Sequence, residues 1–248
     1  MNIHALWCHP RSVSTAFERI MRERGDLTVL HEPFMYHYYL TAKDRLFPDF
    51  QPEPGHPQTY ADIRAMILRK GSTGPVFFKD MAYYVTQDLP ADSEFITAVS
   101  HAFLIRDPAE SALSYQKRDP GFTLTELGVE AQHVLYQHLR DAGAAPLVIT
   151  ADQLRTDPQG TLARYWAHVG LSFVADAFAW DDTVPESWKS VAAWHDTALS
   201  SGEIRAPDVS DTVAELAALG PPYTDYVAHH RPHYDALRAI AHEQAHQK

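Results

Sequence analysis

Five short apolar runs, each followed along the chain by a segment with helical spacing, constrain this sequence more than any other feature. The runs are rich in β-branched or aromatic residues and lie at residues 3–7, 27–30, 76–78, 103–105 and 147–149. Strands that alternate with helices form crossover units, in which neighbouring strands run parallel. The pattern therefore predicts an α/β fold with a central, mainly parallel sheet of about five strands flanked by helices.

Capping residues and apolar spacing indicate where several of the helices begin and end. Thr123 and Glu126 resemble a capping box, which predicts one long helix ending near Gly143. Pro158 after an aspartate is a strong start signal, and Gly170 is a matching stop. Three more helices are expected. One ends at Gly25, one runs from Thr59 to just before Gly71, and one fills the tail from Tyr223 to Lys248.

Overall charge and cysteine content limit the function classes open to this chain. Its net charge is −11 with histidines neutral, which argues against general nucleic-acid binding, where a basic face neutralises phosphates. Cys8 is the only cysteine, so neither an internal disulfide nor a cysteine-based zinc site is expected. No run of about 18 apolar residues and no signal-peptide pattern occurs, so we expect a cytoplasmic protein without a membrane span. Residues 1–248 are expected to form one domain, because no segment reads as a convincing linker.

The first strand pattern passes directly into a helical pattern through residues 10–15, a turn rich in hydroxyl groups that we call the cradle. The unpaired N–H groups and positive dipole of a helix N-terminus bind anions, and Ser12, Ser14 and Thr15 could add hydrogen bonds. Arg11 supplies a permanent charge with forked geometry. The cradle therefore predicts a phosphate-like ligand. Simple N-capping by serine and threonine is the alternative.

A second passage from strand to helix, FLIRDPAESALSYQKR, repeats this arrangement. Arg106 ends the strand pattern, Asp107 is the expected N-cap, and Pro108 occupies the first helical position. Ser114 follows Arg106 by eight residues and could face the same side as the strand end. Arg106 and Ser114 together would suit a second phosphate. In the alternative, Arg106 pairs with Asp107 or Glu110, and Ser114 only packs.

Taken together, these motifs resemble the sulfotransferase family that uses 3′-phosphoadenylyl sulfate (PAPS). HPRSVSTA is similar to that family's loop for the 5′-phosphosulfate, and RDPAESALSY to its 3′-phosphate segment. VITADQLRTDPQGTLARYWAHVGL is similar to a later strand and helix of the family, so the resemblance covers residues 3–171. It implies a P-loop-like three-layer fold, PAPS as donor, 3′,5′-adenosine bisphosphate (PAP) as product, and no metal. The acceptor would be a small-molecule alcohol or phenol, or less favourably an amine.

The resemblance also assigns roles to polar residues. Arg11 would contact the bridging oxygen and stabilise the departing phosphate. Ala16 and Ala151 depart from the family pattern, because aromatic residues stand at these positions in its cytosolic members, one of them stacking on adenine. Arg205 is a weak candidate for the C-terminal 3′-phosphate contact. The other phosphate contacts would be Ser12, Ser14 and Thr15 for the 5′-phosphate and Arg106 and Ser114 for the 3′-phosphate.

The general base is not settled by the resemblance, because the family's Lys-x-His pattern here reads Lys79, Asp80 and then methionine. Glu32 is the first candidate, since it follows the second strand at the sheet edge where ligands collect, and other branches of the family use a carboxylate. Asp80 is the second candidate, and His31 or His9 the third, because a histidine has a suitable unperturbed pKa. Glu32 could instead cap or salt-bridge a loop. Lys79 could hold the sulfuryl group or be a solvated strand-end lysine.

Weaker predictions concern the acceptor pocket, a lid and the tail. The aromatic run of residues 34–40 could line an acceptor pocket, with Tyr36 or His37 approaching the substrate, or could pack in the core. Residues 188–195 could form a lid. The tail histidines could bind a divalent metal through pairs four residues apart or only cover a solvated face; they are His229, His230, His233, His242 and His246.

Two rival functions belong to other classes. One is a P-loop small-molecule kinase, whose GK[ST] loop this sequence lacks. The other is a catalytically silent nucleotide-binding or interaction protein, which the missing histidine of the Lys-x-His pattern suggests. The oligomeric state does not follow from the sequence.

Overall fold

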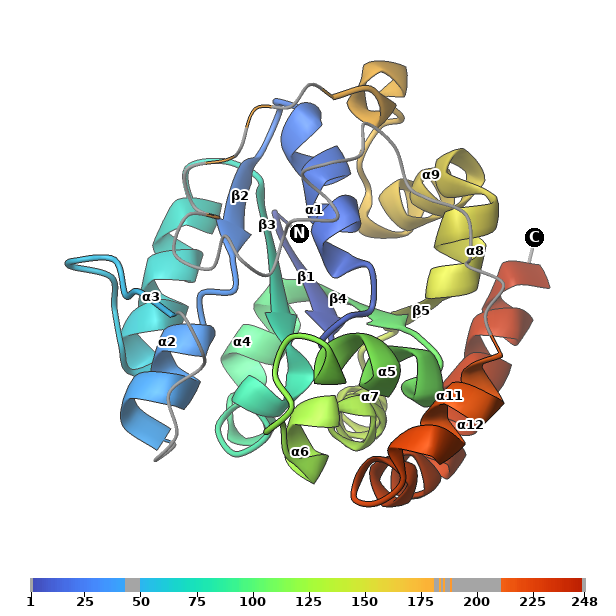
Figure 1. Ribbon diagram of the computed structural model, residues 1–248. Helices are drawn as coiled ribbons and strands as arrows, with labels where there is room; N and C mark the ends of the chain where they lie inside the picture. Colours follow the sequence, from blue (N-terminus) through green and yellow to red (C-terminus); the bar gives the residue numbers. More distant parts are fainter. Residues whose placement is uncertain are drawn as a thin grey trace.

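All five expected strands form one parallel sheet in the computed structural model (Figure 1). Their order is β2-β3-β1-β4-β5, so β1 lies at the centre. The structure describes residues 2–42, 50–180 and 211–246, together with Thr183, Pro185 and Trp188. The predicted α/β class with a parallel five-stranded sheet is confirmed. The strands are β1 (Ile3–Cys8), β2 (Thr28–His31), β3 (Val76–Met81), β4 (Val99–Ile105) and β5 (Leu147–Thr150).

Helices cover both faces of the sheet, because successive strand residues point to opposite sides and most of them are apolar. On one face, the Phe77 ring lies 6.1 Å from that of Phe17 in α1 (Ser14–Glu23) and 6.5 Å from that of Tyr165 in α9 (Pro158–Val169). On the other face, the neighbouring Phe78 ring lies 6.3 Å from that of Phe95 in α4 (Ser93–Ala98). This alternation produces the three layers of the fold.

The register of the central strands brings three chain segments to one edge of the sheet. Trp7 of β1 pairs with Asp80 of β3, and His31 of β2 pairs with Lys79. The cradle follows β1 at this edge, and Arg106 follows β4. Carboxyl ends of parallel strands are where open α/β sheets bind ligands, so the fold assembles the predicted site from separate motifs.

The prediction of a single long helix from the capping box at Thr123 is wrong. Two helices occupy this segment, α6 (Leu124–Leu127) and α7 (Val129–Asp141), although the capping box with Glu126 is present. Gly128 adopts a left-handed φ of 80°, which ends α6 and redirects the chain.

Gly128 is also a point of close approach between α7 and the strand that carries the cradle. A Cβ atom at this position would lie 3.0 Å from Cβ of His9 and 3.1 Å from Cδ1 of Tyr83. Only glycine meets both the backbone and the packing requirement without strain.

The other expected helices are confirmed in position. Thr59 caps α3 (Tyr60–Gly71) by accepting the backbone N–H of Asp62, and the tail forms α12 (Tyr223–His246). Among the described residues, no helix is long and apolar enough to cross a membrane. The remaining elements are α2 (Met35–His37), a π-helical turn (Tyr38–Ala42), α5 (Pro108–Gln116), α8 (Ala151–Thr156), α11 (Thr212–Leu219) and 3-10 turns at Ala82–Tyr84, Leu89–Ala91 and Ala175–Phe178.

Candidate active site

The cradle holds two residues other than glycine in left-handed conformations, Arg11 with φ 63° and Val13 with φ 72°. Residues in such conformations cost about 1–3 kcal/mol each and concentrate at ligand sites. Backbone turns of this kind can direct successive N–H groups toward one point and so form an anion-binding concavity. The cradle therefore has two positive φ angles at residues other than glycine.

The hydroxyl groups of the cradle are not helix caps. The N-cap of α1 is Val13, and no side-chain hydrogen bond caps this helix within the described part of the chain. Ser12 is fully buried, and its Oγ has no hydrogen-bond partner among the described residues. A buried polar group left in this state costs about 1–3 kcal/mol. Ser14 shares a side-chain hydrogen bond with the buried Cys8 thiol.

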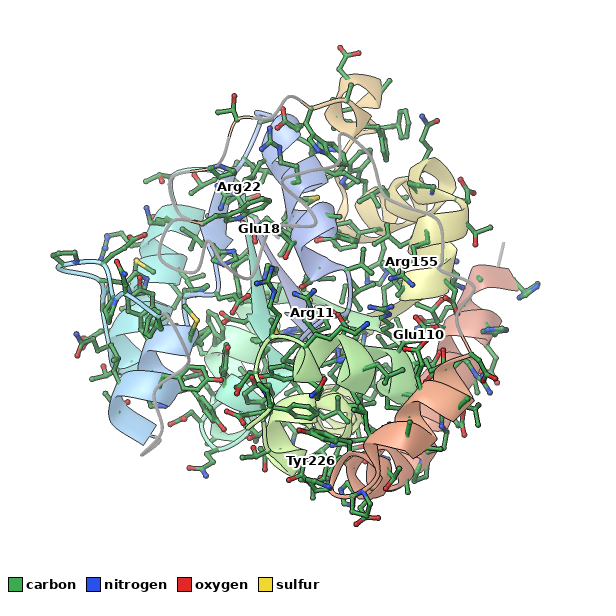
Figure 2. All side chains as sticks on the ribbon, viewed as in Figure 1. Arg11, Glu18, Arg22, Glu110, Arg155 and Tyr226 are labelled. Atoms are coloured by element: carbon green, nitrogen blue, oxygen red, sulfur yellow. The ribbon has the colours of Figure 1, made fainter. Side chains whose placement is uncertain are left out.

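Arg11 joins the cradle to α5. Its Nε donates to Oγ of Ser114 at 2.9 Å, and Nη1 of Arg106 donates to the backbone carbonyl of Arg11 at 2.8 Å. Figure 2 shows Arg11 near the carboxyl end of β1. The structure thus brings Arg11, Arg106 and Ser114 together as the sequence predicts, with Ser114 bonded to Arg11.

Glu110 lies between two arginines beside the cradle. Its Oε2 is 2.7 Å from Nη2 of Arg106 and 3.3 Å from Nη1 of Arg155, which α8 supplies (Figure 2). Burial lowers the pKa of Arg106, and the charge of Arg155 lowers that pKa further. The ion-pair alternative for Arg106 is present in this structure. Arg155 is a second cation at this position that the sequence motifs did not indicate.

A buried ionic network around Lys79 joins β2, β3 and α1. Lys79 is only 1% exposed, so the alternative of a solvated lysine is wrong. Its Nζ donates to Oε1 of Glu32 and lies 3.9 Å from Oε2 of Glu18. Burial alone would lower the pKa of Lys79, but Glu32 and Glu18 raise that pKa above its ordinary value. Lys79 is therefore a fixed cation at the sheet edge.

Glu18 of α1 is the hub of this network. Its carboxylate lies 2.6 Å from Nδ1 of His31 and 2.7 Å from Nη2 of Arg22, and it accepts a hydrogen bond from Nε1 of Trp188 at 2.8 Å (Figure 2). Burial opposes its ionisation, but His31, Lys79 and Arg22 hold the pKa of Glu18 well below its usual range. Glu18 is fully buried, whereas its partner Arg22 is partly exposed.

Glu32 has a left-handed backbone, with φ 42°, immediately after β2. Its N–H donates to the Lys79 carbonyl at 3.0 Å and so continues the β2–β3 pairing. Its Oε1 accepts from Lys79, and its Oε2 accepts from the Tyr84 hydroxyl at 3.4 Å. The predicted salt-bridge alternative is therefore present, on a strained backbone of the kind found at functional sites.

Asp80 and His9 lie close to the same edge but have structural contacts. Oδ2 of Asp80 accepts the backbone N–H of Phe34 at 3.1 Å, and burial raises the pKa of Asp80 well above its usual range. Nε2 of His9 accepts the backbone N–H of Arg106 at 2.9 Å, and burial lowers the pKa of His9 to about 3. Both side chains are committed to holding neighbouring segments in place.

Tyr36 contacts the loop before α3, and His37 contacts the segment after β3. The Tyr36 hydroxyl accepts the N–H of Glu53 at 3.2 Å, and its ring stacks on His56 with centroids 3.6 Å apart. Nε2 of His37 lies 3.0 Å from Oδ2 of Asp88. In the described ranges, neither side chain hydrogen-bonds to Glu32 or Lys79.

A cluster of four tyrosines, Tyr38, Tyr39, Tyr83 and Tyr84, lies between Glu32 and α6. Neighbouring rings have centroids 4.7–5.7 Å apart. The hydroxyls of Tyr39 and Tyr83 are 3.4 Å apart, and Tyr39 donates to Glu126 at 3.4 Å. Burial raises the pKa values of Tyr83 and Tyr84 well above the usual range, so their hydroxyls stay protonated. The tyrosine cluster is an aromatic wall beside Glu32.

A separate cavity of about 360 Å³ opens beside α1, at the start of α9. Ile20 supplies one wall, and Phe178 and Trp180 supply aromatic surface. Thr156, Asp157, Pro158 and Gln159 complete the lining.

Comparison with known proteins decides the family. The model of a family described as "Sulfotransferase domain" matches residues 1–240. The chain belongs to this sulfotransferase family. Two proteins of Arabidopsis thaliana are similar to it, branched-chain-amino-acid aminotransferase-like protein 2 with 29% identity over 208 residues and protein 1 with 28% over 240. These matches cover 83% and 96% of this chain but 36% and 41% of the relatives, so the chain spans about two fifths of their length.

Solved sulfotransferases are also similar to this chain. A sulfotransferase from Alicyclobacillus acidocaldarius has 16% identity and a TM-score of 0.47, covering 88% of this chain and 94% of its own. Mouse sulfotransferase SULT7A1 complexed with PAP has 12% identity and a TM-score of 0.46, and the match covers 95% of this chain and 82% of the mouse chain. The predicted resemblance to sulfotransferases is confirmed by the family match.

Two residues of the candidate site, Glu18 and Arg155, were missed in the sequence. Glu18 borders the apolar stripe of α1, three residues before the buried Met21, and that position was the available signal for its burial. Arg155 reaches the site from a distant segment, so local spacing gave no signal. Trp188, the first residue of the predicted lid, donates a hydrogen bond to Glu18. Arg205 and residues 189–195 of the predicted lid lie outside the described residues.

Proposed function

We propose that this sulfotransferase moves the sulfuryl group of PAPS to the hydroxyl group of a small-molecule alcohol or phenol. The observation that carries the proposal is the buried Oγ of Ser12, which lacks a partner among the described residues and lies between the strained residues Arg11 and Val13. A terminal phosphosulfate would satisfy this hydroxyl and the N-terminal N–H groups of α1. Ser14 and Thr15 would add contacts to the 5′-phosphate.

Transfer would follow an in-line displacement. The acceptor oxygen forms a bond to sulfur while the bond from sulfur to the bridging phosphate oxygen breaks, and PAP departs. Arg11 would stabilise the charge that develops on the departing phosphate. Lys79, which remains cationic, would hold the sulfuryl oxygens.

Glu32 is the proposed general base. It lies at the same sheet edge as the cradle, and the tyrosine cluster beside it would exclude water from a phenolic or apolar alcohol. The acceptor proton would pass to the Glu32 carboxylate as the new bond to sulfur forms. Glu18 would position this pair through its contacts with Lys79 and His31.

Arg106, Arg155 and Ser114 are proposed to bind the 3′-phosphate. A phosphate here would replace Glu110 as the partner of the two guanidinium groups. It would also accept a hydrogen bond from the Ser114 hydroxyl, which now accepts one from Arg11. No metal takes part in this proposal.

A ligand-binding and turnover experiment tests the function. PAP should raise the melting temperature, whereas ATP with Mg²⁺ should not, and labelled PAPS should transfer its label to members of a phenol and alcohol panel. Glu32→Gln should keep the PAP shift and lower kcat by about 10²–10⁴-fold, as expected for a lost general base. A shift with ATP–Mg²⁺ alone would favour the kinase, and no shift with either would favour the silent protein. An E32Q variant with wild-type turnover would remove Glu32 from the mechanism.

A further inference from the structure

Away from the cradle, three metal-ligating side chains converge where α12 runs along α7. Glu130 lies in the first turn of α7, and His229 and His233 lie four residues apart on α12. Oε2 of Glu130 is 2.9 Å from Nε2 of His229, and Oε1 is 4.0 Å from Nε2 of His233. One ligand atom from each residue lies within 4.8 Å of the other two.

Neighbouring histidines hold these ligands in position. Nδ1 of His233 is 3.0 Å from Nδ1 of His133, so a hydrogen bond between the two rings directs Nε2 of His233 toward Glu130. Nδ1 of His230 accepts the backbone N–H of Glu130 at 3.0 Å, and its Nε2 donates to the Leu124 carbonyl at 2.8 Å. A hydrogen bond to the second ring nitrogen is the usual way in which proteins orient a metal-binding histidine.

We infer that Glu130, His229 and His233 bind a divalent first-row transition metal such as Zn²⁺. Ligand atoms around tetrahedral zinc lie about 3.4 Å apart, so the observed separations require only small side-chain adjustments. Two imidazole nitrogens and one carboxylate suit Zn²⁺, Ni²⁺ or Cu²⁺ better than Mg²⁺ or Ca²⁺. Glu130 and His229 are partly exposed, so water can complete the coordination.

An ion pair between Glu130 and His229 is the competing explanation of this cluster. It accounts for the contact of 2.9 Å but gives no role to His233 or to the His133 contact that orients it. A metal would bind all three ligands and would cross-link α12 to α7. α7 in turn contacts the sheet, because Nε2 of Gln132 donates to the carbonyls of Trp7 and Leu104.

Calorimetric titration of the metal-free, untagged protein with Zn²⁺ tests this inference. We expect one equivalent to bind to the wild type, and the double variant H229A/H233A to lose at least about tenfold in affinity. The matched control is H242A/H246A, which removes a second histidine pair with the same spacing from the same helix and should bind like the wild type. His133→Phe should weaken binding about tenfold, as loss of an orienting contact does.

Thermal unfolding provides the second readout. Saturating Zn²⁺ should raise the melting temperature of the wild type and of H242A/H246A, but not that of H229A/H233A, and Mg²⁺ should raise none of them. Circular dichroism establishes that each variant is folded. The inference is overturned if wild type binds no zinc, if H229A/H233A titrates like wild type, or if both double variants lose affinity equally.

Discussion

Lys79 and Asp80 are consecutive in β3, yet their side chains lie on opposite faces of the sheet. Lys79 meets Glu32 and Glu18 on the α1 side, while Asp80 accepts the backbone N–H of Phe34 on the other. The strand alternation therefore separates two titratable groups that are neighbours in the sequence. It assigns the ionic chemistry to Lys79 and a structural contact to Asp80.

Asp80→Asn should consequently preserve sulfuryl transfer, in contrast to Glu32→Gln. The amide oxygen of asparagine can still accept from Phe34. Turnover of labelled PAPS by the two variants, compared at equal PAP affinity, measures the difference. Loss of transfer in D80N with normal PAP binding would exchange the roles proposed for the two carboxylates.

Asp80 should also contribute to the pH dependence of stability. Burial raises the pKa of Asp80 well above its usual range, so the folded state holds this proton more tightly than the unfolded chain. The free energy of unfolding should then fall as pH rises from the usual aspartate value through the raised pKa. Urea unfolding of wild type and D80N between pH 4 and 8 checks this, with a flatter profile expected for D80N.

Glu18→Gln should destabilise the protein by about 3 kcal/mol, because it removes the buried carboxylate that Arg22 pairs with and takes from Lys79 one of its two acidic neighbours, leaving Glu32. The pKa of Glu18 is well below its usual range, so its contribution is complete above the unfolded value and disappears as pH falls through the folded one. The difference in free energy of unfolding between wild type and E18Q should therefore become smaller below about pH 4.5.

Glu23→Gln is the matched control for Glu18→Gln. Glu23 lies on the same helix and pairs with Arg19 at 2.6 Å, but it is partly exposed. Its removal should cost less than about 1 kcal/mol by urea unfolding. Equal losses in E18Q and E23Q would contradict the central place of Glu18 in the network.

Glu110→Gln should strengthen PAP binding, because the carboxylate between Arg106 and Arg155 competes with the 3′-phosphate. Arg155→Met should have the opposite effect, lowering affinity for PAP by about tenfold while leaving adenosine 5′-phosphate nearly unaffected. Calorimetry with both nucleotides gives the ratio of affinities. Ser12→Ala is the control, since it should weaken both ligands equally.

Gly128→Ala should destabilise the protein by about 2–4 kcal/mol for two reasons. The new Cβ atom would approach His9 and Tyr83, and alanine would have to adopt a left-handed φ. Gly143→Ala is the comparison. Gly143 has φ 85° and no atom within 4 Å of an added Cβ, so only the backbone cost of about 1 kcal/mol applies. Urea unfolding of both variants isolates the crowding at Gly128, and equal losses would show that it has no cost.

Local patterns in the sequence were sufficient to predict the sheet and to predict that the cradle and Arg106 lie together. The five apolar runs became the five strands, and the cradle and Arg106 meet at one edge because parallel strands end there. The same patterns could not anticipate that Glu110 would bridge Arg106 to Arg155, since α8 reaches Glu110 only through the tertiary fold.

Errors came where local signals had two physical outcomes. Gly128 sits within a helical pattern, and only its contacts with His9 and Tyr83 show why the chain turns there. Glu18 and Arg22 have the spacing of a surface ion pair, yet Trp188 and His31 enclose Glu18. Burial of a charge depends on partners that lie far away in the sequence, and one chain alone does not reveal them.

The left-handed conformations of Arg11 and Val13 have a consequence for how a ligand enters the cradle. A β-branched residue disfavours a positive φ, so the surrounding fold must impose this conformation on Val13, and the loop has its shape before any ligand arrives. Binding then loses little backbone entropy, and association should proceed without a slow ordering step. Val13→Gly would give the loop more backbone freedom, so ordering the loop would then reduce the free energy of binding.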